Sequence, residues 1–166
     1  MILKVFKKSA LDEEHCKICI SLIRRRFKKR WGIDRKDITI EMIQCRINAV
    51  AYDGNRIVGF LGMEDTGELV NGCAEKEING IYLLAKLARK IVEENQGNAY
   101  FYFAYFPIKD LAIPYSSFIA TKGYLSISSK IIRKKYDNKE ISLRKIKLFT
   151  DERISKSELL KKLKEE

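Results

Sequence analysis

The side chains best suited to chemistry near the start of the chain are an imidazole and two thiols, His15, Cys16 and Cys19, spaced about one helical turn apart. Such groups bind zinc when four ligands converge in a tetrahedron. The other two cysteines, Cys45 and Cys73, are isolated in the sequence, so the spacing does not predict a metal site. Cys73 also has no histidine near it in the sequence, and a core cysteine is the favoured interpretation.

A second candidate is the Asn79-Gly80 pair, which precedes a run of apolar residues at helical spacing from Leu83 to Ile91. The first N–H groups of a helix have no partner within the helix, and the macrodipole adds positive potential there. Because a glycine lets an anion approach the backbone closely, this turn could bind a phosphate group. An ordinary strand-to-helix turn would use the same two residues, so both interpretations stay open.

Periodicity predicts the elements that must position these groups. Ser9 and Asp12 have capping-box spacing ahead of a long helix that ends near Gly32. Gly72, inside a predicted strand, indicates a bulge or a close backbone approach. The predicted strands cover residues 3–6, 48–52, 56–63, 68–74, 99–106 and 124–136, with a weaker extended segment at 141–149. Besides the first helix, the predicted helices cover residues 34–46, 80–95, 114–118 and 159–163.

Composition limits the class of protein. The chain has 166 residues and is 46% hydrophobic, which is enough for one domain with a buried core. The longest apolar run, Ala99 to Ile108, is about half of the ~20 residues that a membrane-spanning helix needs. No secretory signal is visible and a disulfide framework is not expected. We therefore expect a cytoplasmic protein without a membrane partner.

The order of elements over residues 1–136 resembles that of the GNAT family of acyl-CoA N-acyltransferases, with residues 137–166 as a C-terminal extension. The segment Glu77–Tyr82 resembles the family's Gln/Arg-x-x-Gly-x-Gly/Ala loop, which binds the pyrophosphate of acetyl-CoA. Gly123-Tyr124 resembles a Gly-Phe pair near the end of the family's pattern. The resemblance implies an α/β (α+β) fold with a mixed, mainly antiparallel central sheet and helices on both faces.

The resemblance also implies a function: acyl transfer, most simply acetyl transfer, from acetyl-CoA or another acyl-CoA to a small-molecule or peptide amine. It places Glu68 where the family has a base for the amine, and Tyr115 one helical turn before the usual position of the acid. The residues that it implies for contact with the co-substrate are Gly72, Cys73, Ala74, Ile78, Asn79, Gly80, Ile81 and Tyr82.

Two alternatives remain. Glu77 in the loop and Ile119 at the usual tyrosine position favour a GNAT-like binding or regulatory protein without catalysis. The net charge of +11 and the basic run Arg24–Arg30 suggest an anionic partner such as nucleic acid. No nucleic-acid-binding motif accompanies the charge, so a nucleic-acid partner is disfavoured and a solvated helix face is the simpler interpretation. A homodimer is compatible with the sequence.

Overall fold

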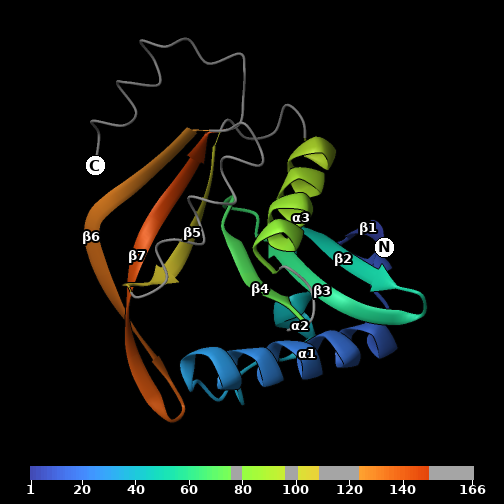
Figure 1. Ribbon diagram of the computed structural model, residues 1–166, viewed down its shortest axis with the longest axis horizontal. Helices are drawn as coiled ribbons and strands as arrows, with labels where there is room; N and C mark the ends of the chain where they lie inside the picture. The colour runs from blue at the N-terminus through green and yellow to red at the C-terminus, as the bar shows by residue number, and fades with distance from the viewer. Residues whose placement is uncertain (76–79, 96–100, 109–123, 150–166) are drawn as a thin grey trace.

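The computed structural model describes residues 1–75, 80–95, 101–108 and 124–149. These residues form strands and helices in a mixed α+β arrangement (Figure 1). The strands are β1 (Ile2–Lys7), β2 (Ile47–Asp53), β3 (Arg56–Met63), β4 (Leu69–Ala74), β5 (Phe101–Pro107), β6 (Tyr124–Tyr136) and β7 (Lys139–Phe149). The helices are α1 (Glu13–Trp31), α2 (Ile40–Ile43) and α3 (Gly80–Glu94), with a 3₁₀ turn, η1, at Lys8–Ala10.

The strands form two antiparallel sheets, with the orders β1-β2-β3-β4 and β5-β7-β6. β4 and β5 connect the sheets at a parallel bridge between Glu68 and Phe103. There the Phe103 N–H donates a hydrogen bond to the Gly67 carbonyl over 3.3 Å. The predicted mixed, mainly antiparallel architecture is thus confirmed.

Helices cover both faces of the first sheet, as Figure 1 shows for α3 on one side and α1 on the other. Strand side chains alternate between the faces, so that Val58 packs with α3 and its neighbour Ile57 packs with α1. We call the two clusters the α3-side core and the α1-side core. The helical residues buried in them are Leu83, Leu87 and Ile91 in the first, and Cys16, Cys19, Leu22, Ile23 and Ile43 of α2 in the second.

The first helix begins later than the sequence predicted. The capping box proposed for Ser9 and Asp12 is wrong, because Ser9 belongs to η1 and Asp12 itself caps α1. The Asp12 carboxylate accepts a hydrogen bond from the His15 N–H over 2.8 Å. The predicted end is confirmed: Gly32 adopts φ 68° and its N–H donates to the Lys28 carbonyl over 3.0 Å.

The helix predicted over residues 34–46 is mostly wrong, since only Ile40–Ile43 are helical. Side chains satisfy the backbone there in place of a continuous helix. The Thr39 hydroxyl accepts from the Met42 N–H at the start of α2. Beyond α2, the Asn48 side-chain carbonyl accepts from the Cys45 N–H over 3.0 Å.

The second sheet extends to the end of β7. This strand pairs with β5 on one side and with β6 on the other. The domain boundary expected after residue 136 therefore falls at the turn of the β6–β7 hairpin. The helices predicted at 114–118 and 159–163 lie outside the described residues.

Candidate functional site

Glu68 lies where the two sheets meet, on the side of α1. Leu69 packs in the α3-side core, so the preceding residue faces the opposite way. Burial raises the pKa of the half-buried Glu68 carboxyl; Lys134 opposes this shift, Glu64 adds to it and Lys145 opposes it. A carboxylate with a raised pKa accepts a proton more readily than an ordinary one, which is a property that a general base needs.

A β-bulge interrupts β4 beside Glu68. The register between β3 and β4 shifts so that Asn71 and Gly72 together lie opposite Leu61. Asn71 adopts φ 57°, a left-handed conformation that asparagine tolerates better than most residues. A Cβ atom on Gly72 would lie 3.1 Å from Leu61 Cδ1 and 3.3 Å from Leu84 Cδ2. The bulge and the close approach predicted at Gly72 are both present, and a bulge leaves backbone groups of the strand out of the ladder.

The start of α3 follows β4 closely, at Gly80. Gly80 does not adopt a positive φ, and a Cβ there would lie 3.4 Å from Ala74 Cβ, an ordinary contact. The glycine therefore leaves the helix start uncrowded without being required by the backbone conformation. The free N–H groups and the macrodipole make this end of α3 favourable for an anion.

A buried arginine lies on the α1 side of the bulge. Arg35 is 3% exposed, and its Nε and Nη2 donate to the two carboxylate oxygens of Asp37 over 3.0 and 3.2 Å. Its Nη1 donates to Asn71 Oδ1 over 3.1 Å. The rings of Phe27 and Tyr136 lie 5.0 and 5.2 Å from the guanidinium carbon. The guanidinium thus contacts α1, the α1–α2 loop, β4 and β6.

The tip of the β6–β7 hairpin docks on the end of α1, next to Arg35. Asn138 Nδ2 donates to the Gly32 carbonyl over 3.2 Å, and its Oδ1 accepts from the Asp34 N–H over 2.9 Å. Lys139 Nζ donates to the Trp31 carbonyl over 3.0 Å. The hairpin therefore forms a wall on the α1 side of the junction, with Lys134 on β6 and Lys145 on β7 close enough to Glu68 to influence its pKa.

Solved structures with a similar fold include N-acetyltransferases and other acetyltransferases. An N-acetyltransferase from Staphylococcus aureus is similar with a TM-score of 0.67 and 11% identity, covering 90% of this chain and 99% of that one. A ribosomal-protein-alanine N-acetyltransferase from Brucella melitensis gives 0.62 and 11%, covering 90% and 99%. A Bacillus subtilis acetyltransferase in complex with CoA gives 0.55 and 12%, covering 89% and 99%.

This chain has the GNAT fold. No protein-family model matches the sequence, and no curated protein sequence matches it either. The similarity to the solved structures therefore lies in the arrangement of helices and strands. The resemblance noted in the sequence also rested on the order of these elements. At these identities it shows the fold, and the site has to be judged from the residues themselves.

The structure distributes three residues of the site predicted from the GNAT resemblance along β4. Glu68 directly precedes the strand, Gly72 lies in its bulge, and Gly80 begins α3 after its end. Cys73 and Ala74 are buried, one in each core, so their backbone groups are what they can offer a ligand. Burial also raises the pKa of the Cys73 thiol, which disfavours a reactive thiolate.

The remaining predicted residues are only partly described. Ile81 and Tyr82 belong to the first turn of α3. Ile78, Asn79 and Tyr115 lie outside the described residues. For these three the roles drawn from the GNAT resemblance remain predictions.

Arg35 and Asn71 were missed by reasoning from the sequence. Asn71-Gly72 within a strand segment was a usable signal, because both residue types tolerate left-handed backbone conformations. Arg35 gave no signal, since its hydrogen-bond partner on β4 is distant in the sequence and only the fold brings the two together.

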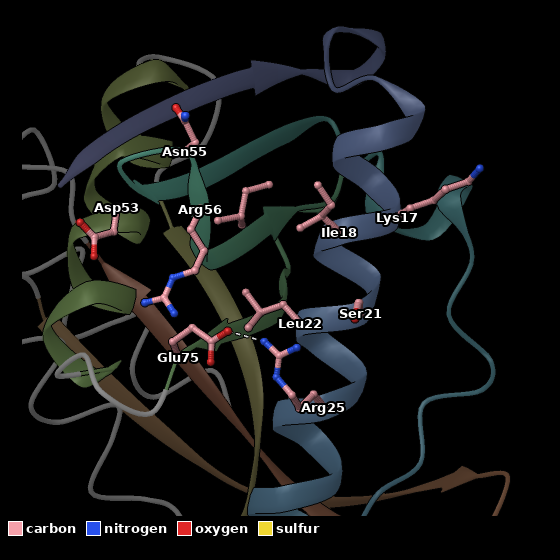
Figure 2. A pocket seen from close by; sticks show the side chains of 10 residues that line it. Lys17, Ile18, Ser21, Leu22, Arg25, Asp53, Asn55, Arg56 and Glu75 are labelled. Carbon is pink, nitrogen blue, oxygen red and sulfur yellow. Dashed lines mark hydrogen bonds and ion pairs between the residues drawn. The ribbon is translucent and has the colours of Figure 1, made fainter.

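A groove lies between α1 and the β2–β3 hairpin, with a volume of about 820 Å³ (Figure 2). Arg25 on α1 forms an ion pair with Glu75 after β4 across this groove, whereas Lys17 points away from it. Arg24 likewise pairs with Asp34 over 3.4 Å. The basic run of α1 is thus partly neutralised by acidic neighbours, in keeping with a solvated helix face.

Two further observations concern the described part of the chain. It contains no group of three or more His, Cys, Asp or Glu side chains that could hold a metal ion. None of its helices is sufficiently long and apolar to cross a lipid bilayer.

Proposed function

We propose that this protein transfers an acyl group from an acyl-CoA, in the simplest case acetyl-CoA, to an amine. The observation that carries the proposal is Glu68, a carboxyl group with a raised pKa at the junction of β4 and β5, beside a bulge in β4 of a GNAT fold. The solved Bacillus subtilis relative in fold was determined in complex with CoA, which supports the same class of co-substrate here.

The residues present fit such a co-substrate. The start of α3 would receive the pyrophosphate, because Gly80 leaves space for close approach and the helix terminus favours negative charge. The backbone of β4 around Asn71 and Gly72 would hold the pantetheine arm and the thioester carbonyl. Glu75, which lies between β4 and α3, is already paired with Arg25, so its repulsion of a phosphate is reduced.

Glu68 would act as the general base. It takes a proton from the protonated amine, directly or through a water molecule, and the neutral nitrogen then attacks the thioester carbonyl carbon. A carbon–nitrogen bond forms and the carbon–sulfur bond breaks. The nitrogen loses its extra proton to solvent as the amide forms, and the CoA thiolate leaves and takes up a proton. From the sequence, Tyr115 is the proposed donor of that proton. Holding the two substrates together would supply much of the rate enhancement.

The acceptor is an amine on a small molecule or a peptide. A peptide amine finds support in the name of the Brucella melitensis protein of similar fold, a ribosomal-protein-alanine N-acetyltransferase. The acceptor would enter on the α1 side of the sheet, because Glu68 faces that side and the docked β6–β7 hairpin forms its wall.

The test is an acyl-transfer assay with acetyl-CoA and a panel of amines, following both release of the CoA thiol and the mass of the product. We expect turnover by the wild type and a fall in kcat of about 100-fold or more for Glu68→Gln, because a general base contributes on that order. Glu93→Gln, the same change at an exposed site on α3, is the matched control and should retain wild-type kcat. Equal rates for wild type and Glu68→Gln would refute the role of Glu68.

A GNAT-fold protein that binds CoA without catalysis is the second candidate, favoured by Glu77 in the loop and Ile119 at the usual tyrosine position. The same assay separates the two candidates. Saturable acetyl-CoA binding without turnover on any amine would favour the binding protein.

A further inference from the structure

Arg35 forms more hydrogen bonds and ring contacts than are needed to hold its own loop between α1 and α2. A guanidinium that is 3% exposed is costly to bury unless its charge and donors are satisfied. Asp37, two residues away, already supplies a charged partner with three hydrogen bonds. The remaining donor, Nη1, reaches across to Asn71 on β4. The contacts with Asp37 are enough to stabilise the α1–α2 loop. They do not explain the long-range hydrogen bond to Asn71.

The residue held by Arg35 is the one with unusual backbone conformation. Asn71 adopts φ 57° within the bulge of β4, a left-handed conformation that asparagine adopts more readily than most residues but less readily than glycine. Its side-chain carbonyl oxygen accepts the hydrogen bond from Arg35 Nη1 over 3.1 Å. This hydrogen bond restrains the Asn71 side chain and, through it, the backbone of the bulge.

The same guanidinium connects the two sheets. Asn71 belongs to β4 of the first sheet, and Tyr136, whose ring lies 5.2 Å from Arg35, ends β6 of the second. Phe27 of α1 packs on the guanidinium as well, 5.0 Å from its carbon. Arg35 therefore lies where it can hold both the bulge and the spacing between β4 and the hairpin wall.

We propose that Arg35 is a positioning residue that keeps the Asn71–Gly72 bulge of β4 in the conformation needed for acyl transfer. This inference rests on the proposed function, because the bulge would hold the thioester. Arg35 touches no reacting atom in this account and acts through Asn71. Its loss should therefore lower kcat more than it weakens the binding of acyl-CoA.

Amide hydrogen exchange tests the structural half of the proposal without any substrate. We expect Arg35→Met, which keeps an unbranched apolar side chain but loses the donors, to speed exchange at Asn71–Cys73 by about tenfold. Amides of Leu83–Ile91 in α3 should exchange at the wild-type rate. Equal acceleration in both segments would indicate general loosening of the protein and would overturn the proposal.

Kinetics in two backgrounds test the functional half. Arg35→Met should lower kcat by about tenfold and change KM for acetyl-CoA by less than about twofold. In an Asn71→Gly background, Arg35→Met should lower kcat by less than about twofold, because glycine takes a positive φ without an anchored side chain. The same loss in both backgrounds would show that Arg35 does not act through Asn71.

Arg35→Lys provides a second variant in case Arg35→Met does not fold. It keeps the positive charge beside Asp37 but not the fork that reaches two partners at once, so it should change exchange and kcat in the same direction. Wild-type exchange and kcat in Arg35→Lys would overturn the proposal. If the wild type transfers no acyl group at all, the proposed function fails, while the exchange experiment still decides the role of Arg35.

Discussion

The two faces of the first sheet use the same strands for different purposes. The α3-side core is built almost entirely from aliphatic and alanine side chains, joined by Tyr102. The α1-side core contains Cys16, Cys19 and Cys73 and is bordered by polar groups that include Arg35 and Glu68. Because neighbouring residues of a strand face opposite ways, one face can be optimised for packing while the other carries chemistry. We therefore expect substitutions on the α3 side to change mainly stability, and substitutions of the polar groups on the α1 side to change mainly the proposed activity.

The largest expected effect concerns stability on the α3 side. Leu87 is 0% exposed, and Leu87→Ala should lower the free energy of unfolding by about 4 kcal/mol, because the cavity it leaves is closed on all sides. Leu22, 2% exposed on α1, also lines the groove of Figure 2. Leu22→Ala should cost only about 2–3 kcal/mol, because its cavity can open to the groove. Urea denaturation measures the free energy of unfolding of both variants. A larger loss for Leu22→Ala would contradict the expected difference between the two faces.

The next effect compares two glycines that differ in their neighbours. A Cβ on Gly59 would lie 2.7 Å from Leu83 Cδ2 in the α3-side core, whereas the nearest atom at Gly72 is 3.1 Å away. Gly59→Ala should therefore cost about 2 kcal/mol of stability through overpacking. Gly72→Ala should cost less than about 1 kcal/mol, since side-chain shifts of a few tenths of an ångström relieve the contact. Thermal unfolding of the two variants checks this order, and the reverse order would contradict it.

The smallest effect has the opposite sign. Because burial raises the pKa of Glu68 in the folded state, the folded protein holds this proton more tightly than the unfolded chain. Its contribution to stability is full below the unfolded pKa and is lost as the pH rises through the folded pKa. Glu68→Gln should therefore raise the unfolding temperature at neutral pH, and the difference should vanish below about pH 3, where the carboxyl is protonated in both states.

The control for this experiment is Glu93→Gln. Glu93 pairs with Arg89 over 3.2 Å on the exposed side of α3, so its replacement should give no gain in stability. A Glu68→Gln protein that is less stable than the wild type at neutral pH would show that the carboxylate is structural.

Local patterns predicted most of the fold. The hairpin around Asp53–Asn55 and the helix from Gly80 follow from turn chemistry and apolar spacing, and both are present with nearly the predicted bounds. The helix predicted over residues 34–46 was mostly wrong because their apolar residues are spaced like a helix. In the structure Thr39 caps a short helix that begins only at Ile40, and beyond that helix the Asn48 side chain accepts the hydrogen bond of the Cys45 N–H.

The site was predictable only in part. Gly72 marked the bulge, and the family resemblance placed Glu68 at the start of β4. Neither could give the raised pKa of Glu68, because that shift comes from burial in the folded chain and is opposed by Lys134 on a distant strand. Arg35 depends on Asn71 and Tyr136, which the chain brings near it only after both sheets have formed. Such long-range contacts leave no local pattern to read.

The most direct test of the central claim, that the junction of β4 and β5 is an acyl-CoA site, is a calorimetric titration of the protein with acetyl-CoA. We expect saturable one-site binding by the wild type and loss of binding in Gly80→Val, because the valine side chain would block close approach to the start of α3. The unfolding temperature of Gly80→Val should stay near the wild-type value, since Gly80 has no positive φ and its nearest neighbour for a Cβ is 3.4 Å away. A wild-type protein that binds no acetyl-CoA would contradict the proposed acyl-CoA site. A Gly80→Val protein that binds acetyl-CoA as well as the wild type would contradict the placement of the pyrophosphate at the start of α3.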